Sequence, residues 1–152
     1  MQFANPTPTA VKFKRLSTTA VIPKYTREND ACLDLYCAQE TTLLCGETKI
    51  IPTDLAIELP KGFEARVRGR SGLASKGFHV HHGTIDEEYR GNVGIIMTNT
   101  NGTTGAHTFK VGDRIAQFSI TPVFPIMVLE AEELSNTNRG TDGFGSSDKV
   151  VD

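Results

Sequence analysis

The residues most able to do chemistry lie together in one stretch, Gly83-Thr84-Ile85-Asp86-Glu87-Glu88-Tyr89-Arg90-Gly91. It places the carboxylate of Asp86 near the phenol of Tyr89, and the glycines at both ends allow the backbone to turn sharply. Apolar residues precede and follow it, at Val80 and at residues 93–97, as expected for flanking strands. A solvated hairpin tip is the simplest interpretation, but a plain turn would not need an acid, a phenol and a guanidinium so close together. The stretch is therefore a candidate wall of an active site.

A second set of candidates, Arg70-Ser71-Gly72, follows an alternating strand at residues 63–68 and begins a predicted short helix that Gly77 ends. Backbone N–H groups at a helix start, a hydroxyl and a guanidinium together form a cradle for phosphate. A serine-hydrolase elbow would need Gly-x-Ser-x-Gly, but Leu73 occupies the last position. The pattern favours phosphate binding over a nucleophilic serine.

The C-terminal residues, 135–152, change in composition to serine, asparagine, threonine and glycine, so we expect a flexible arm there. A disordered tail is the plain interpretation, yet the arm carries Arg139, Phe144, Gly145 and Ser146 in close order. A P-loop would need Gly-Lys-Ser/Thr before a helix, and this pattern is absent. An arginine for phosphate and a phenylalanine for stacking instead indicate a lid.

Asp34 is the lone carboxylate in an otherwise apolar predicted strand, residues 31–38, and bare burial would be costly, so it needs a partner or a metal. Neither the three cysteines, which form no C-x-x-C pair, nor the histidines of residues 79–82 have the spacing of a recognisable metal site. An odd number of cysteines without a secretory signal favours reduced thiols in the cytoplasm, or in the host-cell cytoplasm for a phage- or virus-encoded protein.

Composition narrows the class of protein. The chain has 152 residues, 38% apolar and 22% charged, which fits one globular domain, here expected over residues 1–134. A net charge of -2 gives no electrostatic reason to expect nucleic acid as a partner, although a few arginines could still hold a polyanionic small molecule. No apolar run is long enough to span a membrane, so no membrane partner is expected.

Short strands must position these groups. Strands are predicted at residues 11–14, 31–38, 49–59 with a break at Pro52, 63–68, 93–97 and 114–120. With turns rich in Gly and Asn and almost no helical periodicity, they predict an all-β sandwich or barrel. Residues 123–129 are almost continuously apolar, which predicts a segment buried on both sides, and the prolines there favour an edge or an arm exchanged between subunits.

Five sets of residues occur in one order: Ala31-x-x-Asp34-Leu35, residues 70–74 (Arg-Ser-Gly-Leu-Ala), residues 83–91, residues 112–117 (Gly-Asp-Arg-Ile-Ala-Gln) and residues 139–146 (Arg-Gly-x-x-Gly-Phe-Gly-Ser). The order resembles the trimeric dUTPases, deoxyuridine triphosphate pyrophosphatases, from Ala31 to Ser147. The resemblance implies a distorted jelly-roll β-sandwich of the β-clip type, assembled as a homotrimer with active sites at the subunit interfaces.

The resemblance also implies an activity, which is hydrolysis of dUTP to dUMP and pyrophosphate by in-line attack of water at the α-phosphorus. Such a reaction limits uracil incorporation into DNA and supplies dUMP for dTMP synthesis. By motif, Asp86 would be the general base, and Asp34 would support a hydrated Mg²⁺ through water.

The implied substrate-binding residues divide by the part of the nucleotide they would hold. Tyr89 would pack under the deoxyribose and exclude a 2′-hydroxyl, and the backbone around Gly83, Thr84, Ile85 and Gly94 would read uracil. Phosphate oxygens would be held by Arg70, Ser71, Gly72 and Gln117. From the arm, Arg139 would reach the terminal phosphate and Phe144 would stack on uracil, with Gly145 and Ser146 beside it.

Two alternatives stay open on the same fold. A dCTP deaminase would need a catalytic glutamate deep in the site and a different Ser-Arg motif, neither of which is found. A nucleotide-gated binding protein would dock its arm on a regulatory protein, and the inserted segment common in such proteins is absent. Cys32, Gly69 and Asp142 depart from the family pattern, and Asp142 would slow arm closure by repelling the triphosphate.

Overall fold

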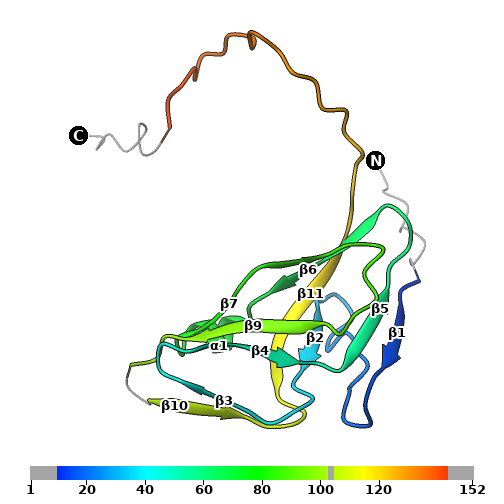
Figure 1. Cartoon of the computed structure of the whole chain (residues 1–152), viewed down its shortest axis with the longest axis vertical. Coiled ribbons are helices and arrows are strands. Elements are labelled where there is room, and N and C mark those ends of the chain that lie inside the picture. Colours follow the sequence, from blue (N-terminus) through cyan, green and yellow to red (C-terminus); the bar gives the residue numbers. More distant parts are fainter. Residues whose placement is uncertain (1–9, 103–104, 144–152) are drawn as a thin grey trace.

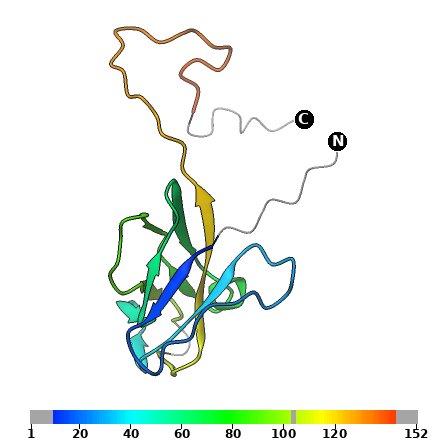
Figure 2. The ribbon, with the colours of Figure 1, turned by 90° about the vertical axis from the view of Figure 1, so that its right-hand side faces the viewer.

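The computed structural model describes residues 10–102 and 105–143. This part of the chain forms eleven short strands and one helical turn, packed into a β-body from which the C-terminal residues extend (Figures 1 and 2). The strands and the helix are β1 (Lys12–Arg15), β2 (Leu33–Tyr36), β3 (Thr41–Leu44), β4 (Thr48–Pro52), β5 (Leu55–Glu58), β6 (Phe63–Arg68), α1 (Ser71–Ala74), β7 (Phe78–Val80), β8 (Gly83–Ile85), β9 (Gly94–Asn99), β10 (Ala106–Phe109) and β11 (Arg114–Pro122).

Antiparallel pairing arranges these strands in four groups. The largest sheet has the order β2-β11-β6-β8, and a second sheet has the order β4-β9-β7. Two strand pairs, β1-β5 and β10-β3, complete the body. The predicted all-β class is thus confirmed. The break expected at Pro52 is also found, because β4 ends there and β5 starts at Leu55.

The stretch from residue 83 to residue 91 is not the simple hairpin that its flanks predict. Strand β8 pairs with β6 in the first sheet, whereas β9 pairs with β4 and β7 in the second. The stretch therefore crosses from one sheet to the other. A crossing loop leaves its side chains less constrained by cross-strand neighbours than a two-strand turn would.

Burial alternates along β9 and β6, which shows which face of each strand packs against the core. Ile95 and Met97 are fully buried while Ile96 is exposed, and Ala65 and Val67 of β6 also face inward, as their alternation predicts. The start of β11 breaks this pattern, since Ile115 and Ala116 are adjacent and both buried. A register shift between Arg114 and Ala116 explains it, because a β-bulge lets two neighbouring residues face the same side.

The predicted helix exists as one turn, and Gly77 ends it. Gly77 has a φ of 82°, which glycine adopts without the strain that a side chain would cause, and its N–H donates to the oxygen of Ala74 at 3.0 Å. This helical turn is too short and not apolar enough to cross a membrane, and the part of the chain that the structure describes has no other helix.

Residues 123–143 leave the β-body after β11 and extend away from it in both views (Figures 1 and 2). The apolar side chains that follow Val123 are open to solvent, with Phe124 81% and Ile126 83% exposed. The sequence predicted that residues 123–129 are buried, but no other part of the same chain covers them among the described residues.

Candidate functional site

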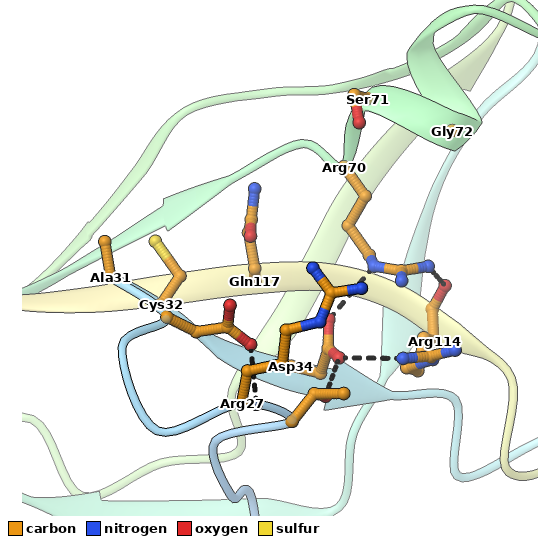
Figure 3. Close-up of a pocket in the computed structure, with 11 residues that line it drawn as sticks. Arg27, Ala31, Cys32, Asp34, Arg70, Ser71, Gly72, Arg114 and Gln117 are labelled. Carbon is orange, nitrogen blue, oxygen red and sulfur yellow. Dashed lines mark hydrogen bonds and ion pairs between the residues drawn. The ribbon is translucent and has the colours of Figure 1, made fainter.

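An open pocket of about 630 Å³ lies where β2, β11 and the start of α1 meet (Figure 3). We call it the basic pocket, and its charged and polar lining includes Thr26, Arg27, Asp34, Arg70, Ser71, Arg114 and Gln117. Strand register builds its floor. Gln117 of β11 pairs with Asp34 of β2 on one side and with Arg68 of β6 on the other. Arg70 follows two residues later, at the point where the chain turns into α1.

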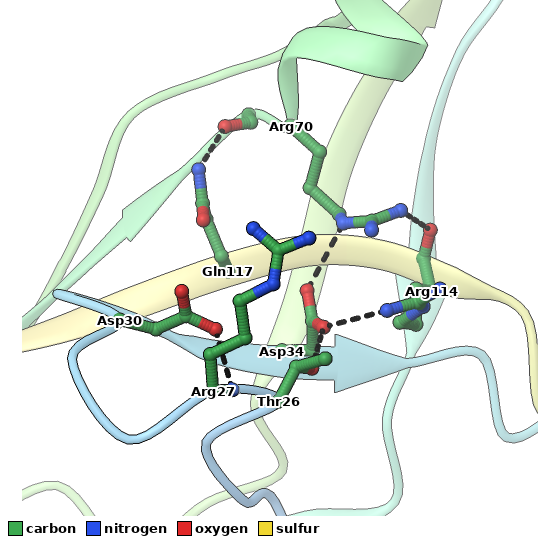
Figure 4. A network of polar contacts seen from close by, with 8 residues as sticks. Thr26, Arg27, Asp30, Asp34, Arg70, Arg114 and Gln117 are labelled. Carbon is green, nitrogen blue, oxygen red and sulfur yellow. Dashed lines mark hydrogen bonds and ion pairs between the residues drawn. The ribbon is translucent and has the colours of Figure 1, made fainter.

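Asp34 is the centre of a network of charges in this pocket (Figure 4). Its Oδ1 lies 3.0 Å from Nε of Arg70, and its Oδ2 lies 3.3 Å from Nη1 of Arg114. The hydroxyl of Thr26 donates to Oδ2 as well, at 3.2 Å. The carboxylate thus has the partner that its burial requires, and the partners are guanidinium groups.

The excess of cations over acids makes this pocket suited to an anion. Arg70 and Arg114 face Asp34, and Arg27 and Asp30 line the same space, so three arginines stand against two carboxylates. Arg70 is also held in place by donating from Nη1 to the oxygen of Arg114 at 3.2 Å. Guanidinium groups that are already oriented can turn their remaining N–H donors to phosphate oxygens.

The side chain of Gln117 forms a hydrogen bond with the backbone just before α1. Its Nε2 donates to the oxygen of Gly69 at 2.8 Å, which fixes the approach to Ser71 and Gly72. A side chain at Gly69 would come only within 3.6 Å of Val80, an ordinary contact, so the structure gives no steric reason for glycine there.

A second pocket of about 240 Å³ is lined by the stretch that crosses between the sheets. We call it the loop pocket, and its lining includes Gly83, Thr84, Ile85, Asp86, Tyr89, Asn92, Gly94 and Ile96. Strand β8 supplies the first three residues, and Asp86 follows directly after it. The lining thus combines strand backbone with a carboxylate and a phenol.

Tyr89 is held at both ends although its side chain is 45% exposed. Its N–H donates to the oxygen of Asp86 at 3.1 Å, and its hydroxyl donates to the oxygen of Asn92 at 2.9 Å. A Cβ at Gly91 would lie only 2.4 Å from the Tyr89 hydroxyl, so the ring rests against bare glycine backbone. The phenol ring therefore has a defined place in the loop pocket.

Asp86 of the loop pocket and Arg70 of the basic pocket lie beyond opposite ends of the paired part of β6. In the register of β6 with β8, Ala65 faces Ile85, so Asp86 comes next to Glu64, while Arg70 lies beyond the other end of the strand. At about 3.3 Å per residue, Asp86 and Arg70 are roughly 20 Å apart along one chain. The pockets share no lining residue, and one chain does not bring the acid to the arginines.

The residues predicted from sequence thus fall into separate groups. Asp34, Arg70, Ser71, Gly72 and Gln117 meet in the basic pocket, and Gly83, Thr84, Ile85, Asp86, Tyr89 and Gly94 meet in the loop pocket. Arg139 lies on the C-terminal extension, where its Nε donates to the oxygen of Asp142 at 2.9 Å. Phe144, Gly145 and Ser146 lie outside the described residues.

Sequence reasoning missed some lining residues. Arg114 belongs to the motif of residues 112–117, but nothing in the sequence shows that its side chain reaches Asp34 on the paired strand β2. Asn92 follows the recognised stretch directly and supplies the acceptor for Tyr89. Thr26 and Arg27 enter from a loop that had no signal beyond its polarity.

The all-β fold and the arginine-lined pocket together suit a protein that binds a phosphorylated ligand. Comparison of the sequence with models of protein families identifies the family, because the model described as dUTPase matches residues 18–148. The chain belongs to the dUTPase family.

Relatives support this assignment over most of the chain. The deoxyuridine 5′-triphosphate nucleotidohydrolase of Crocosphaera subtropica is 44% identical over 146 residues, which cover 90% of this chain and 97% of the relative. The protein of the same name from Clostridioides difficile is 44% identical over 142 residues, covering 90% of this chain and 96% of the relative.

Solved structures of phage dUTPases share the fold. The Staphylococcus bacteriophage 80alpha dUTPase with dUpNHpp aligns with a TM-score of 0.86 at 30% identity, covering 91% of this chain and 98% of that chain. A mutant dUTPase of phage phi11 of S. aureus, which coordinates a structural Mg(II) ion, aligns with a TM-score of 0.78 at 27% identity, covering 84% of this chain and 99% of that chain. The predicted jelly-roll class is thereby confirmed.

Proposed function

We propose that the protein hydrolyses dUTP to dUMP and pyrophosphate, with water attacking the α-phosphorus in line. The observation that carries the proposal is the division of the site. One pocket is lined by three arginines and two carboxylates, with Asp34 paired to Arg70 and Arg114, and the other places a carboxylate beside strand backbone and a phenol. The first arrangement suits a triphosphate, and the second suits a nucleoside. Membership of the dUTPase family supports the pairing of the two.

Asp86 is the proposed general base. It lines the loop pocket just after β8 and is exposed, so it can accept a proton from a water that faces the α-phosphorus. A positioned carboxylate base contributes a rate factor of roughly 10² to 10⁴. Fixed donors aimed at developing phosphate charge supply the rest without a covalent nucleophile, which agrees with the exposed, unactivated Ser71.

The loop pocket is proposed to select the nucleoside. The backbone of Gly83, Thr84, Ile85 and Gly94 would pair with the uracil edge, and a site built this way rejects bases that leave its donors unpaired. A Cβ at Gly94 would lie 2.5 Å from Cγ2 of Ile50, so any larger residue there would have to displace that exposed side chain. Tyr89 would pack under the deoxyribose and exclude a 2′-hydroxyl.

We propose that a complete site needs more than one copy of the chain, as in a homotrimer. The support is the roughly 20 Å between Asp86 and Arg70 along β6, which exceeds what one α-phosphate can bridge. The uncovered apolar run after Val123 also suits a subunit interface. Residues 135–152 would act as the arm of a neighbouring copy, with Arg139 at the terminal phosphate and Phe144, Gly145 and Ser146 over uracil.

Magnesium is the proposed cofactor, and the donor set fits it only through water. Among the described residues no three histidine, cysteine or acidic groups come together to hold a metal. Mg²⁺ keeps several of its waters and binds phosphates readily, so it would neutralise triphosphate charge while Asp34 accepts hydrogen bonds from its waters. Arg70 and Arg114 would then turn toward phosphate oxygens, leaving lone pairs of Asp34 available.

A nucleotide panel tests the proposal. Purified protein with Mg²⁺ is given dUTP, UTP, dCTP and dTTP in parallel, and released pyrophosphate and ammonia are measured. We expect pyrophosphate from dUTP alone at a high rate. Comparable release from dCTP, or any ammonia, would replace dUTP hydrolysis by another reaction. The expected cellular role is to limit uracil in DNA and supply dUMP, in the cytoplasm.

A further inference from the structure

Asp54 is a buried acid that lies in neither pocket. It occupies the connection between β4 and β5 and is only 6% exposed. Its φ of 51° is the one positive value outside glycine among the described residues. A buried carboxylate and an unfavourable backbone conformation at the same residue persist only where surrounding contacts hold them.

The contacts of Asp54 lead directly to the loop pocket. Nδ2 of Asn92 donates to its Oδ1 at 2.9 Å, and Nε2 of Gln39 lies 3.3 Å from each carboxylate oxygen. Burial acts to raise the pKa of this carboxyl, but hydrogen bonds from Ser17, Gln39 and Asn92 together hold the pKa below its ordinary value. Asp54 is therefore an anion at neutral pH, and it orients the amide of Asn92.

Asn92 is also the residue that holds the Tyr89 ring, since its backbone oxygen accepts from the phenol at 2.9 Å. The two neighbours of Asp54, Thr53 and Leu55, form hydrogen bonds with Val93, the residue after Asn92. Thr53 Oγ1 donates to the oxygen of Val93 at 2.7 Å, and the Val93 N–H donates to the oxygen of Leu55 at 2.8 Å. The connection between β4 and β5 thus holds the end of the crossing stretch through both side chain and backbone.

We infer that Asp54 is a positioning residue for sugar selection: it fixes Asn92, and Asn92 fixes the phenol of Tyr89 at the nucleoside pocket. The inference rests on the proposed role of Tyr89 at the deoxyribose. A carboxylate suits this task because two amide donors from different segments can share it, and hydrogen bonds to a charged acceptor are the stronger ones. A carboxylate that served only the fold would leave selectivity unaffected by its removal.

The test compares kcat/KM for dUTP with kcat/KM for UTP. Asp54→Asn keeps the shape and tolerates a positive φ, but its amide group faces two amide donors and can accept fully from only one. Asp54→Gly relieves the backbone strain while removing the carboxylate. We expect both variants to lose about tenfold of the preference for dUTP, the factor expected for one lost charged hydrogen bond, with kcat on dUTP much less affected.

Asn92→Ala should give the same loss with Asp54 in place, and combining it with Asp54→Asn should add little, because both changes remove one interaction. In a Tyr89→Phe background, which lacks the hydroxyl, Asp54→Asn should no longer alter the preference. The matched control is Glu47→Gln, since Glu47 is also a hydrogen-bonded acid, accepting from the Leu44 N–H at 2.9 Å, but it lines neither pocket and its partners are Leu44 and Lys49. The control should leave the preference unchanged, whatever its effect on thermal stability.

The ring itself gives an independent readout. The chain has three tyrosines, so ring signals in NMR spectra of tyrosine-labelled protein are few and Tyr89→Phe assigns those of Tyr89. We expect the Tyr89 signals to shift and average in Asp54→Asn and to stay in place in Glu47→Gln. An unchanged preference and unchanged ring signals in Asp54→Asn and Asn92→Ala would overturn the inference if Tyr89→Ala alters the preference. An unchanged preference in Tyr89→Ala would instead remove the sugar-gate role itself.

Discussion

Gly91 provides a change that should disturb function and spare the fold. An ideal Cβ at this position would lie 2.4 Å from Oη of Tyr89, 2.6 Å from Cζ and 3.0 Å from Cε2. Ordinary contacts begin at 3.4 Å, so in Gly91→Ala the phenol end of the ring must move by at least about 1 Å. The backbone of Gly91 does not have the positive φ that excludes alanine, so the methyl group acts through the ring alone.

The stability cost of this movement should be small, because Tyr89 is 45% exposed and can shift toward solvent. We expect the free energy of unfolding to change by less than about 1 kcal/mol. The hydrogen bond to Asn92 would be lost, and a displacement of about 1 Å at a reacting site can cost up to about 10²-fold. The preference for dUTP over UTP should therefore fall at least about tenfold.

Steady-state kinetics with both nucleotides and thermal unfolding of the same preparations measure the two effects. Gly102→Ala is the matched control, because a Cβ at Gly102 meets nothing within 4 Å. It should behave like the unchanged protein in both assays. A structure of Gly91→Ala with a displaced ring, together with an unchanged preference for dUTP, would refute the reasoning that links ring position to sugar selection.

Three further predictions concern the two pockets and the arm. Asp86→Asn should still bind dUTP with Mg²⁺ but lose at least about a hundredfold in turnover, and near-normal turnover would remove Asp86 from the base role. Asp34→Asn should lower the free energy of unfolding by about 1–2 kcal/mol, because it weakens a largely buried acceptor shared by Arg70 and Arg114, and an unchanged denaturation midpoint would contradict this. Truncation before Arg139 should leave the melting temperature unchanged and abolish most turnover. Full activity of the truncated protein would show that the arm has no role in catalysis.

Local alternation was sufficient to predict several strands. Residues 63–68 and 93–97 alternate because each of these strands has one buried and one open side, and β6 and β9 follow. The start of β11 could not be predicted, since its bulge comes from pairing with a distant strand rather than from local sequence. The crossing of residues 83–91 between two sheets was missed for the same reason.

The resemblance implied a site shared between subunits, but the contacts within each pocket could not be predicted from the sequence. Motifs identified Asp34 and Arg70, yet their ion pair depends on how β2 and β6 flank β11. Asp54 gave no signal because its role arises from a contact with Asn92 across 38 positions of the chain. The separation of Asp86 from Arg70 likewise appears only once the register of β6 and β8 is known.

Subunit mixing tests most directly the claim that each site is shared between copies. Asp86→Asn and Arg70→Ala proteins, each nearly inactive alone, are unfolded together in equal amounts, refolded and assayed for pyrophosphate release from dUTP. If the acid and the arginine of one site come from different copies, random assembly gives about one quarter of the sites both intact groups, and about one quarter of normal activity returns. Activity that stays at the level of the separate variants would contradict the shared site and place both groups in one chain.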